Sequence, residues 1–418
     1  MNDYPSDIPS QDPDETRQRR RRRAADRARV RRRWQWATLA AVTLIAVLVA
    51  ARMSGSSTPR RHAAKTTIRT PAIIPGGPLA PGSSGGLAAL WAPQNVVGAQ
   101  PGTARAYEAA SKLAGLPGYL MIADRGNNRI LIVNPAHQIV FEYPGPAEAG
   151  RLFFDDDTFI EPGGEYVISN EEGDHAIVQV NLARRTQQVL FGEPGVPGSD
   201  SAHLHEPDDA YMLPDGTFTV ADAENCRILF IRAHRIVRSY GHSAVCRHDP
   251  PAYFNQVNGD TPLPGGGVLV SEIEGNWLDE IGPEGRLLWS IRAPVSYPSD
   301  PQPLPGGRVL LADYASPGHV LILDRHGRVR WRYGPEQGYG RLDHPSLAMP
   351  LPNGDIVVND DYRDRVVVID PRKKRIVWQY GHTDTPGTAP GYLNTPDGLD
   401  FIPAGSNGMP DYAAVVHP

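Results

Sequence analysis

The sequence predicts an all-β fold, a six-bladed β-propeller of four-stranded antiparallel blades, preceded by one transmembrane helix. Three observations support this prediction. A proline-marked strand unit recurs beyond residue 118, the first and last units are incomplete in complementary ways, and an uncharged 18-residue segment lies near the N-terminus. Four short strands per repeat of 40–50 residues are typical of propeller blades.

The repeat begins with a short strand that ends at Pro-Gly or Pro-x-Gly. These prolines are separated by 52, 50, 41, 47 and 51 residues, and they are Pro162, Pro214, Pro264, Pro305, Pro352 and Pro403. A β-branched strand and a strand that often ends in an aromatic residue and Gly, such as 375–381 (RIVWQYG), complete the unit. This order predicts four strands in each blade.

The second strand of each unit ends in an acid or an amide. The series is Asp124, Asn170, Asp222, Glu272, Asp313 and Asp360. Short polar side chains at strand ends commonly hydrogen-bond to loop backbone. We therefore expect this series to be structural.

The first and last units complete each other. Residues 119–143 supply a second, third and fourth strand, and residues 392–403 supply only a first strand. Joined, they make a sixth blade, so the C-terminal strand should close the ring beside the N-terminal blade. Closure removes the exposed strand edges that favour aggregation.

The N-terminal region predicts a membrane anchor. Residues 1–33 carry 11 Arg against 6 acids, and they precede the uncharged segment WQWATLAAVTLIAVLVAA. Basic residues stay on the cytoplasmic side, which places the propeller outside the membrane. The alternative is a signal peptide cleaved near Ala51. The expected parts are a cytoplasmic Arg-rich tail (1–33), a transmembrane helix (34–52), a linker with a short helix (53–115), the propeller (116–405) and a C-terminal tail (406–418).

The propeller region is strongly acidic. Residues 119–418 carry 24 basic and 40 acidic side chains, a net charge of −16. Such a surface repels a phosphate backbone, which argues against nucleic-acid binding. The charge instead suits a soluble extracytoplasmic domain or a cationic ligand.

Two stretches resemble the NHL repeat. Residues 123–130 (ADRGNNRI) and 221–228 (ADAENCRI) are similar to its Ala-Asp strand end followed by Asn and Arg-Ile, and the resemblance extends over residues 119–403. It implies a six-bladed propeller, and Arg129, Arg227 and Arg365 match the NHL arginine. The fourth and fifth blades lack this Arg and look as much like quinoprotein-type repeats.

A series of polar residues stands six positions before each proline, where the first strand of each blade should enter the central channel. The following residue is also acidic in three blades. The candidate ligand-binding residues at this channel mouth are therefore Asp156, Asp157, Asp208, Asp209, Asn258, Asp300 and Asp397. Converging carboxylates suit Ca²⁺ or a cationic group. The alternative is that these residues, with Ser299 and Ser346, cap the turns that enter the strands.

Histidines are frequent in the connections between blades, which we expect to lie on one face. The candidate metal ligands are His203, His205, His242, His344 and His382. Converging imidazoles would suit Zn²⁺, and the arrangement resembles the NHL-type amidating lyase, whose propeller carries metal ligands at its channel. The alternative is that these loop histidines are solvated.

Cys226 and Cys246 are the only cysteines. Both should lie on the same face of one blade, which predicts a disulfide in an oxidising compartment.

The expected function is that of a membrane-anchored extracytoplasmic module that binds a protein, a cell-wall component or a small molecule. The alternative is a metal-dependent propeller enzyme, either a lyase like the NHL amidating lyases or a transferase like the propeller arylsulfotransferases. A structural spacer is the third possibility, because fold alone does not choose among these classes.

Overall fold

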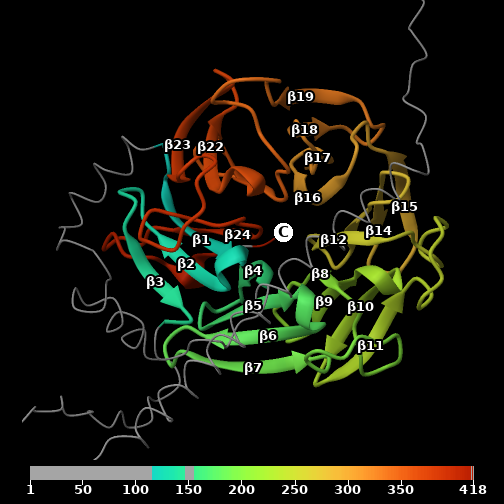
Figure 1. Ribbon diagram of the computed structural model, residues 1–418. Coiled ribbons are helices and arrows are strands. Elements are labelled where there is room, and N and C mark those ends of the chain that lie inside the picture. Colours follow the sequence, from blue (N-terminus) through green and yellow to red (C-terminus); the bar gives the residue numbers. More distant parts are fainter. Residues whose placement is uncertain (1–114, 146–154, 416, 418) are drawn as a thin grey trace, which may run out of the picture. The chain divides into compact units, whose positions relative to one another are not determined.

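The computed structural model describes residues 115–145, 155–415 and 417. These residues form six four-stranded antiparallel sheets placed as blades around a common centre (Figure 1). The predicted all-β six-bladed propeller is confirmed. The predicted segments 1–33 and 34–52 lie outside the described residues, as does the linker up to residue 114. Within the described residues, no helix is long and apolar enough to span a bilayer.

The blades are named I to VI, and each is given from its innermost to its outermost strand. Blade I contains β24 (Leu399–Pro403), β1 (Gly118–Asp124), β2 (Arg129–Val133) and β3 (Ile139–Tyr143). Blade II contains β4 (Asp155–Ile160), β5 (Tyr166–Glu171), β6 (Ala176–Asn181) and β7 (Thr186–Phe191). Blade III contains β8 (Pro207–Asp209), β9 (Phe218–Asp222), β10 (Arg227–Arg232) and β11 (Arg235–Tyr240).

The other three blades repeat this order. Blade IV contains β12 (Val257–Pro262), β13 (Val268–Glu272), β14 (Trp277–Ile281) and β15 (Leu287–Arg292). Blade V contains β16 (Pro298–Leu304), β17 (Arg308–Asp313), β18 (His319–Leu323) and β19 (Val329–Tyr333). Blade VI contains β20 (Ala348–Pro350), β21 (Ile356–Asp360), β22 (Arg365–Asp370) and β23 (Arg375–Gly381).

The strand sequences follow from where the strands lie. The second and third strands of a blade face a neighbouring blade on both sides, so β9 and nearly all of β10 are buried and read as apolar runs. The outermost strand β11 is mostly exposed and carries Arg and Ser between its apolar residues. This difference in burial explains why the second and third strands of the repeat read as continuous apolar runs and the outermost strand does not.

The ring closes through the C-terminal strand. β24 pairs antiparallel with β1, in a register that joins Gly118 to Pro403 and Ile122 to Leu399. The predicted composite blade is therefore confirmed. All six blades have a neighbour on each side, and the inner strand of blade I comes from the opposite end of the chain.

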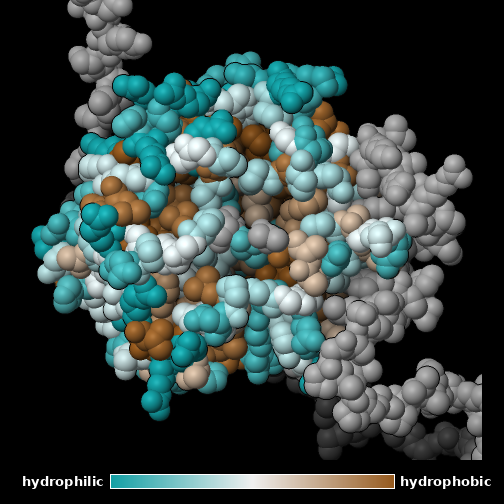
Figure 2. Space-filling model, turned by 180° about the vertical axis from the view of Figure 1, so that it is seen from behind, coloured by the Kyte–Doolittle hydropathy of each residue, from teal (hydrophilic) through white to brown (hydrophobic). Residues whose placement is uncertain are grey.

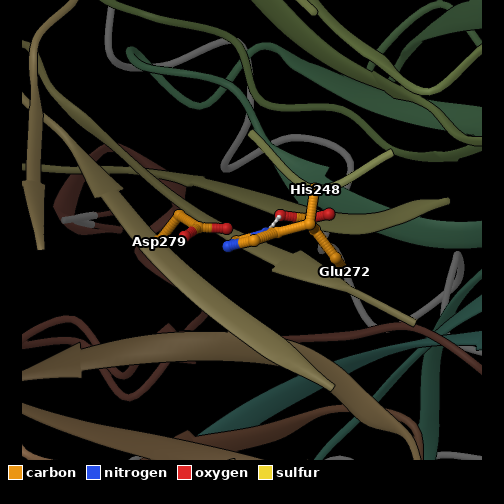
Figure 3. Close-up of side chains that lie close together, drawn as sticks. All are labelled: His248, Glu272 and Asp279. Carbon is orange, nitrogen blue, oxygen red and sulfur yellow. Dashed lines mark hydrogen bonds and ion pairs between the residues drawn. The ribbon is translucent and has the colours of Figure 1, made fainter. Parts of the chain in front are cut away.

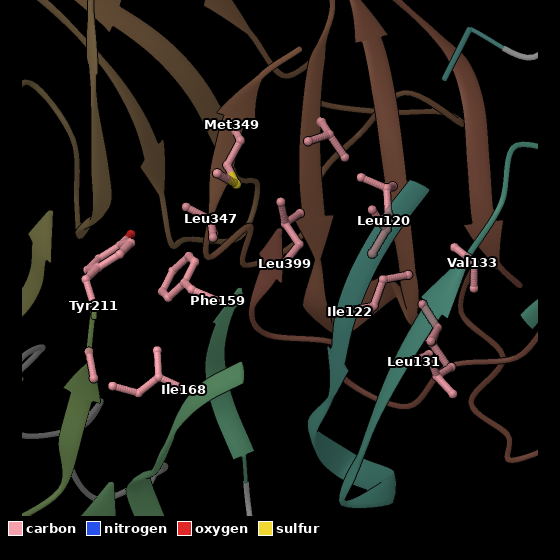
Figure 4. Close-up of a cluster of buried hydrophobic side chains, with 14 of the residues drawn as sticks. Leu120, Ile122, Leu131, Val133, Phe159, Ile168, Tyr211, Leu347, Met349 and Leu399 are labelled. Atoms are coloured by element: carbon pink, nitrogen blue, oxygen red, sulfur yellow. The ribbon is translucent and has the colours of Figure 1, made fainter. Parts of the chain in front are cut away.

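The largest hydrophobic cluster spans several blades around the centre. It includes Ile122 from blade I, Phe159 from blade II, Tyr211 from blade III and Met349 from blade VI (Figure 4). The rings of Phe159 and Tyr211 stack with their centroids 4.0 Å apart. Packing between blades, rather than within one sheet, thus supplies much of the core.

The residues after β24 also pack against the propeller. Tyr412 is buried, and the Tyr119 hydroxyl donates a hydrogen bond to the carbonyl of Gly408 at 2.7 Å. His417 lies against blades I and II, because its Nε2 is 3.0 Å from the Ile160 carbonyl and 3.2 Å from Asp400. The face opposite to that seen in Figure 1 shows hydrophobic residues around its centre and hydrophilic ones towards its rim (Figure 2).

Candidate functional site

The series predicted at the channel mouth does converge. Each member stands at or just before the first residues of an inner strand, and six of the seven candidates are buried. The buried ones are Asp156, Asp157, Asp209, Asn258, Asp300 and Asp397, while Asp208 is partly exposed. Ser299 and Ser346 occupy the corresponding positions in blades V and VI and are also buried. The inner strands therefore bring carboxylates from four blades to one end of the channel.

One side of this ring holds a positive charge, that of Arg125 in the short turn after β1. Its guanidinium contacts Asp156 at 2.7 Å and also pairs with Asp397 and Glu172. Burial works against the ionised form of Asp397, but Arg125 outweighs it and holds the pKa of that carboxyl below its ordinary value. Arg125 thus joins blades I and II as an internal counter-ion.

The other side of the ring has acids as its dominant electrostatic neighbours. Burial raises the pKa of Asp157 well above the ordinary value, and the negative charges of Asp300 and Asp209 raise it further. The pKa of Asp300 is raised in the same way, first by burial and then by neighbouring acids. The Oδ1 atoms of Asp157 and Asp300 are buried without a hydrogen-bond partner. Buried carboxylate oxygens in this condition are costly, unless a proton or a cation occupies them.

Hydrogen bonds between neighbouring blades account for other members of the series. Asn258 donates to Asp208 at 2.6 Å, and Asn258 accepts from the backbone N–H of Asp300 at 3.1 Å. The hydroxyl of Ser346 donates to the Asp397 carbonyl at 2.7 Å. Asn258 and Ser346 therefore fit the alternative interpretation, in which these residues hold the turns that lead into the inner strands. It leaves the free oxygens of Asp157 and Asp300 unexplained.

The acids at the ends of the second strands have a structural role in three blades. In each, the carboxylate accepts a hydrogen bond from the Arg Nε five residues later, at 2.6–2.7 Å. The pairs are Asp124–Arg129, Asp222–Arg227 and Asp360–Arg365. In blade II the strand extends to Glu171, which pairs with Ala176 as Asp124 pairs with Arg129, so Asn170 is one position out of the predicted series.

Blade IV differs from these blades at the same position. His248 Nδ1 lies 2.7 Å from a carboxyl oxygen of Glu272, and Asp279 of β14 points towards the same imidazole (Figure 3). Burial raises the pKa of Glu272 well above its ordinary value, and the adjacent Asp279 raises it further. Within the described residues, these three form the one group of three or more His, Cys, Asp or Glu side chains whose ligand atoms all lie within 4.8 Å of one another.

The five histidines predicted as metal ligands lie elsewhere. His203 contacts Asp200 at 2.8 Å and Glu193 at 3.2 Å, with both acids largely exposed. His205 packs edge-on against His175, with ring centroids 5.6 Å apart.

The other three predicted histidines each pack on a tyrosine from their own or a nearby loop. The pairs are His242–Tyr253, His344–Tyr362 and His382–Tyr392. Within the described residues the five histidines form no three-ligand group, so their role in metal binding stays a prediction.

The two cysteines are joined as predicted. Cys226 and Cys246 form a disulfide with Cα atoms 5.3 Å apart. Cys226 ends the turn between β9 and β10, and Cys246 lies in the connection from β11 to β12. The disulfide therefore fastens the connection that carries His248 to a loop of blade III.

Sequence reasoning missed Arg125 and Asp279 as members of these sites. Arg125 lies within the NHL-like residues 123–130, in a turn of polar residues where its sequence context does not distinguish it from a solvent-exposed arginine. Asp279 had a stronger signal, because it is an acid at a third-strand position where the other blades carry Leu or Val. Glu272 was recognised as a member of the strand-end series, but nothing in its spacing of 24 residues from His248 indicated contact.

Comparison with known proteins gives the fold a context. No family model and no curated protein sequence match the chain. Solved structures do match over most of the propeller. A protein of unknown function from Bacteroides caccae has 20% identity and a TM-score of 0.48, covering 68% of this chain and 98% of its own.

Two further structures match at similar levels. A streptogramin B lyase has 16% identity and a TM-score of 0.46, covering 70% of this chain and 85% of its own. A chain in a nidogen/laminin complex has 12% identity and a TM-score of 0.47, covering 67% and 97% respectively. These likenesses carry no argument about function, and membership of the NHL-repeat family stays a prediction.

Proposed function

We propose that this propeller is a binding module whose channel mouth holds a cationic group. The observation that carries the proposal is the set formed by Asp157, Asp209 and Asp300. All three are buried, their dominant electrostatic neighbours are acids, and two of them present unpartnered oxygens. A cation at this place supplies the charge that Arg125 supplies on the other side of the ring.

Two kinds of cation share this chemistry. Ca²⁺ takes six to eight oxygen ligands from carboxylates, carbonyls and water, in flexible geometry. An organic ammonium group forms charge-assisted hydrogen bonds to the same oxygens. A protein or cell-wall partner remains an expectation from the sequence. Such a partner would bind at the channel mouth through an ammonium group of its own.

Thermal unfolding of the full-length protein with CaCl₂ or with a linear diamine tests the proposal. Binding to the folded state raises the melting temperature, and the increase grows with the concentration of free cation. The shift should disappear in Asp157→Asn and Asp300→Asn. It should persist in Asp215→Asn, which alters an exposed turn acid bonded to Thr217. The absence of any shift with either cation, or a shift that survives in both channel variants, would overturn the proposal.

Membrane anchoring and an extracytoplasmic location belong to the same proposal. The uncharged segment 34–51 after an Arg-rich tail supports an anchor. The Cys226–Cys246 disulfide supports an oxidising compartment. In cells that produce the full-length chain, the protein should stay in the membrane pellet after alkaline carbonate extraction, and protease added outside should reach the propeller. A soluble fraction, or protection from external protease, would contradict this placement.

A further inference from the structure

Blade IV keeps the acid of the repeat but not its arginine. Glu272 pairs across the sheet with Trp277, whereas Asp124, Asp222 and Asp360 pair with arginines. Its Oε2 atom accepts the backbone N–H of Asn255 at 2.5 Å, so one oxygen still organises the preceding connection. The other oxygen faces His248 rather than a guanidinium.

A second acid stands beside Glu272 at a position that is otherwise apolar. Asp279 pairs with Val270, and the residue at the same place in the other five blades is aliphatic and buried. Those residues are Leu131, Val178, Leu229, Leu321 and Val367. Placing a carboxylate in this core position is expensive, so a compensating partner is expected.

No basic side chain forms an ion pair with the Asp279 carboxylate among the described residues. Its side chain is fully buried and neither oxygen makes a close hydrogen bond, while burial raises its pKa and the nearby Glu272 carboxyl and Ser290 hydroxyl lower it. The carboxylate points towards His248, whose other ring nitrogen contacts Glu272 (Figure 3). An unpartnered buried acid aimed at an imidazole and a second acid is an arrangement that a cation would complete.

We propose that His248, Glu272 and Asp279 bind one divalent transition-metal ion of the Zn²⁺ class. One imidazole nitrogen and two carboxylates are ligands that Zn²⁺ accepts, and a water completes four-coordination. The ligand atoms lie within 4.8 Å of one another. Rotation of the His248 ring, together with shifts of the two carboxylates, would bring one imidazole nitrogen and one oxygen of each acid to the ~2 Å metal–ligand distances of such sites. This site is separate from the channel mouth and does not depend on the cation proposed there.

The position of the ligands indicates what the ion does. His248 lies in the connection between β11 and β12, and Glu272 and Asp279 lie in β13 and β14. The ion would tie this connection to blade IV, which is the task that Arg129, Arg227 and Arg365 perform in their blades. The His248 side chain is 22% exposed, which leaves the site a route to solvent. Its ring stacks on Trp277 with centroids 3.9 Å apart, so the imidazole is already oriented.

The competing occupant of the site is a proton shared by Glu272 and Asp279. The test is the Zn²⁺ content and affinity of the full-length protein, measured by elemental analysis and by titration after chelator treatment. We expect one Zn²⁺ per chain and an increase in melting temperature on addition of the metal. A protein without stoichiometric Zn²⁺ binding would hold the proton instead, and the proposal would be overturned.

Two variants and one control locate the ion. Asp279→Leu installs the residue that three other blades carry, and it should weaken Zn²⁺ binding by more than the ~100-fold that loss of an outer-shell partner can cost. His248→Gln should do the same, and it answers the question independently if Asp279→Leu folds poorly. His203→Gln is the control, because His203 also contacts two acids but in an exposed loop. Zn²⁺ binding retained in both site variants, or lost in the control, would contradict the assignment.

Discussion

Blades III and IV are neighbours in the ring, yet they treat the same acid differently. In blade III, Asp222 accepts the backbone N–H of His205 at 2.8 Å and the Nε of Arg227 at 2.6 Å. In blade IV, Glu272 accepts the corresponding backbone N–H of Asn255. Its second oxygen meets His248, and no arginine takes the place of Arg227.

The difference separates a structural acid from a candidate ligand. Asp222 has a permanent counter-ion from its own sheet, so its hydrogen bonds are satisfied and Arg227 opposes the increase in pKa that burial causes. Glu272 shares its surroundings with a second buried acid and a titratable ring. Comparison of equivalent positions in a repeat therefore identifies a site better than the presence of acids, which recur in every blade for folding reasons.

The largest expected effect comes from breaking a pair of the blade III type. Arg365 is fully buried and donates to Asp360 at 2.7 Å and to the carbonyls of Tyr339 and Arg341. Arg365→Met should lower the free energy of unfolding by about 3–5 kcal/mol, because it leaves a buried carboxylate uncompensated. Chemical denaturation measures the loss. Arg330→Met removes an exposed pair with Asp324 and should change little; equal losses in the two variants would refute the structural role.

Next in size is the disulfide that connects the two regions compared. Replacing both cysteines, Cys226→Ser with Cys246→Ser, should cost about 3 kcal/mol, since the crosslink closes a loop of about 20 residues. It should also weaken Zn²⁺ binding, because Cys246 lies two residues before His248. Denaturation and metal titration of the double variant check both effects. Unchanged Zn²⁺ affinity would show that the connection keeps its place without the crosslink.

The smallest effect concerns a third way of compensating a buried acid. His417 contacts Asp400, and although burial opposes protonation, Asp400 raises the pKa of the imidazole above its ordinary value. A raised pKa means that the contact stabilises the fold fully below about pH 6.5 and loses this effect as the pH rises through the folded-state pKa. His417→Gln should therefore lower the melting temperature more at acidic than at alkaline pH.

The matched control for this pH dependence is His234→Gln. The ring of His234 contacts the Leu190 carbonyl and no carboxylate, so its variant should show no such trend. A His417→Gln deficit that grew with pH would reverse the sign and contradict the ion pair with Asp400.

Much of the fold could be predicted because it is repetitive. The prolines from Pro162 to Pro403 mark turns after inner strands. The strand that the first unit lacks is the one strand that the last unit supplies, which predicts a composite blade. Residue spacing also placed the channel-mouth acids, because equivalent positions in a closed ring must converge. Such predictions rest on local pattern and on symmetry.

The sites themselves depend on contacts that the repeat does not encode. Arg125 reaches Asp397 across 272 positions of sequence, and His248 meets Glu272 through an irregular connection. His242 and His382 also lie in connections between blades, as His248 does, yet their rings stack on tyrosines and meet no pair of buried acids among the described residues. Only Asp279 broke a local rule, since it is an acid at an apolar position of its strand, and that irregularity was the available clue.

The central claim is that Asp222 is compensated by the protein itself and Glu272 is not. The direct test is chemical denaturation of Asp222→Asn and Glu272→Gln in metal-free buffer. Asp222→Asn should be destabilised by about 3–5 kcal/mol, because Arg227 stays buried without its counter-ion. Glu272→Gln should be neutral or more stable than the unaltered protein, because its amide keeps one acceptor and can donate to Asp279. A comparable loss of stability in both variants would contradict the claim.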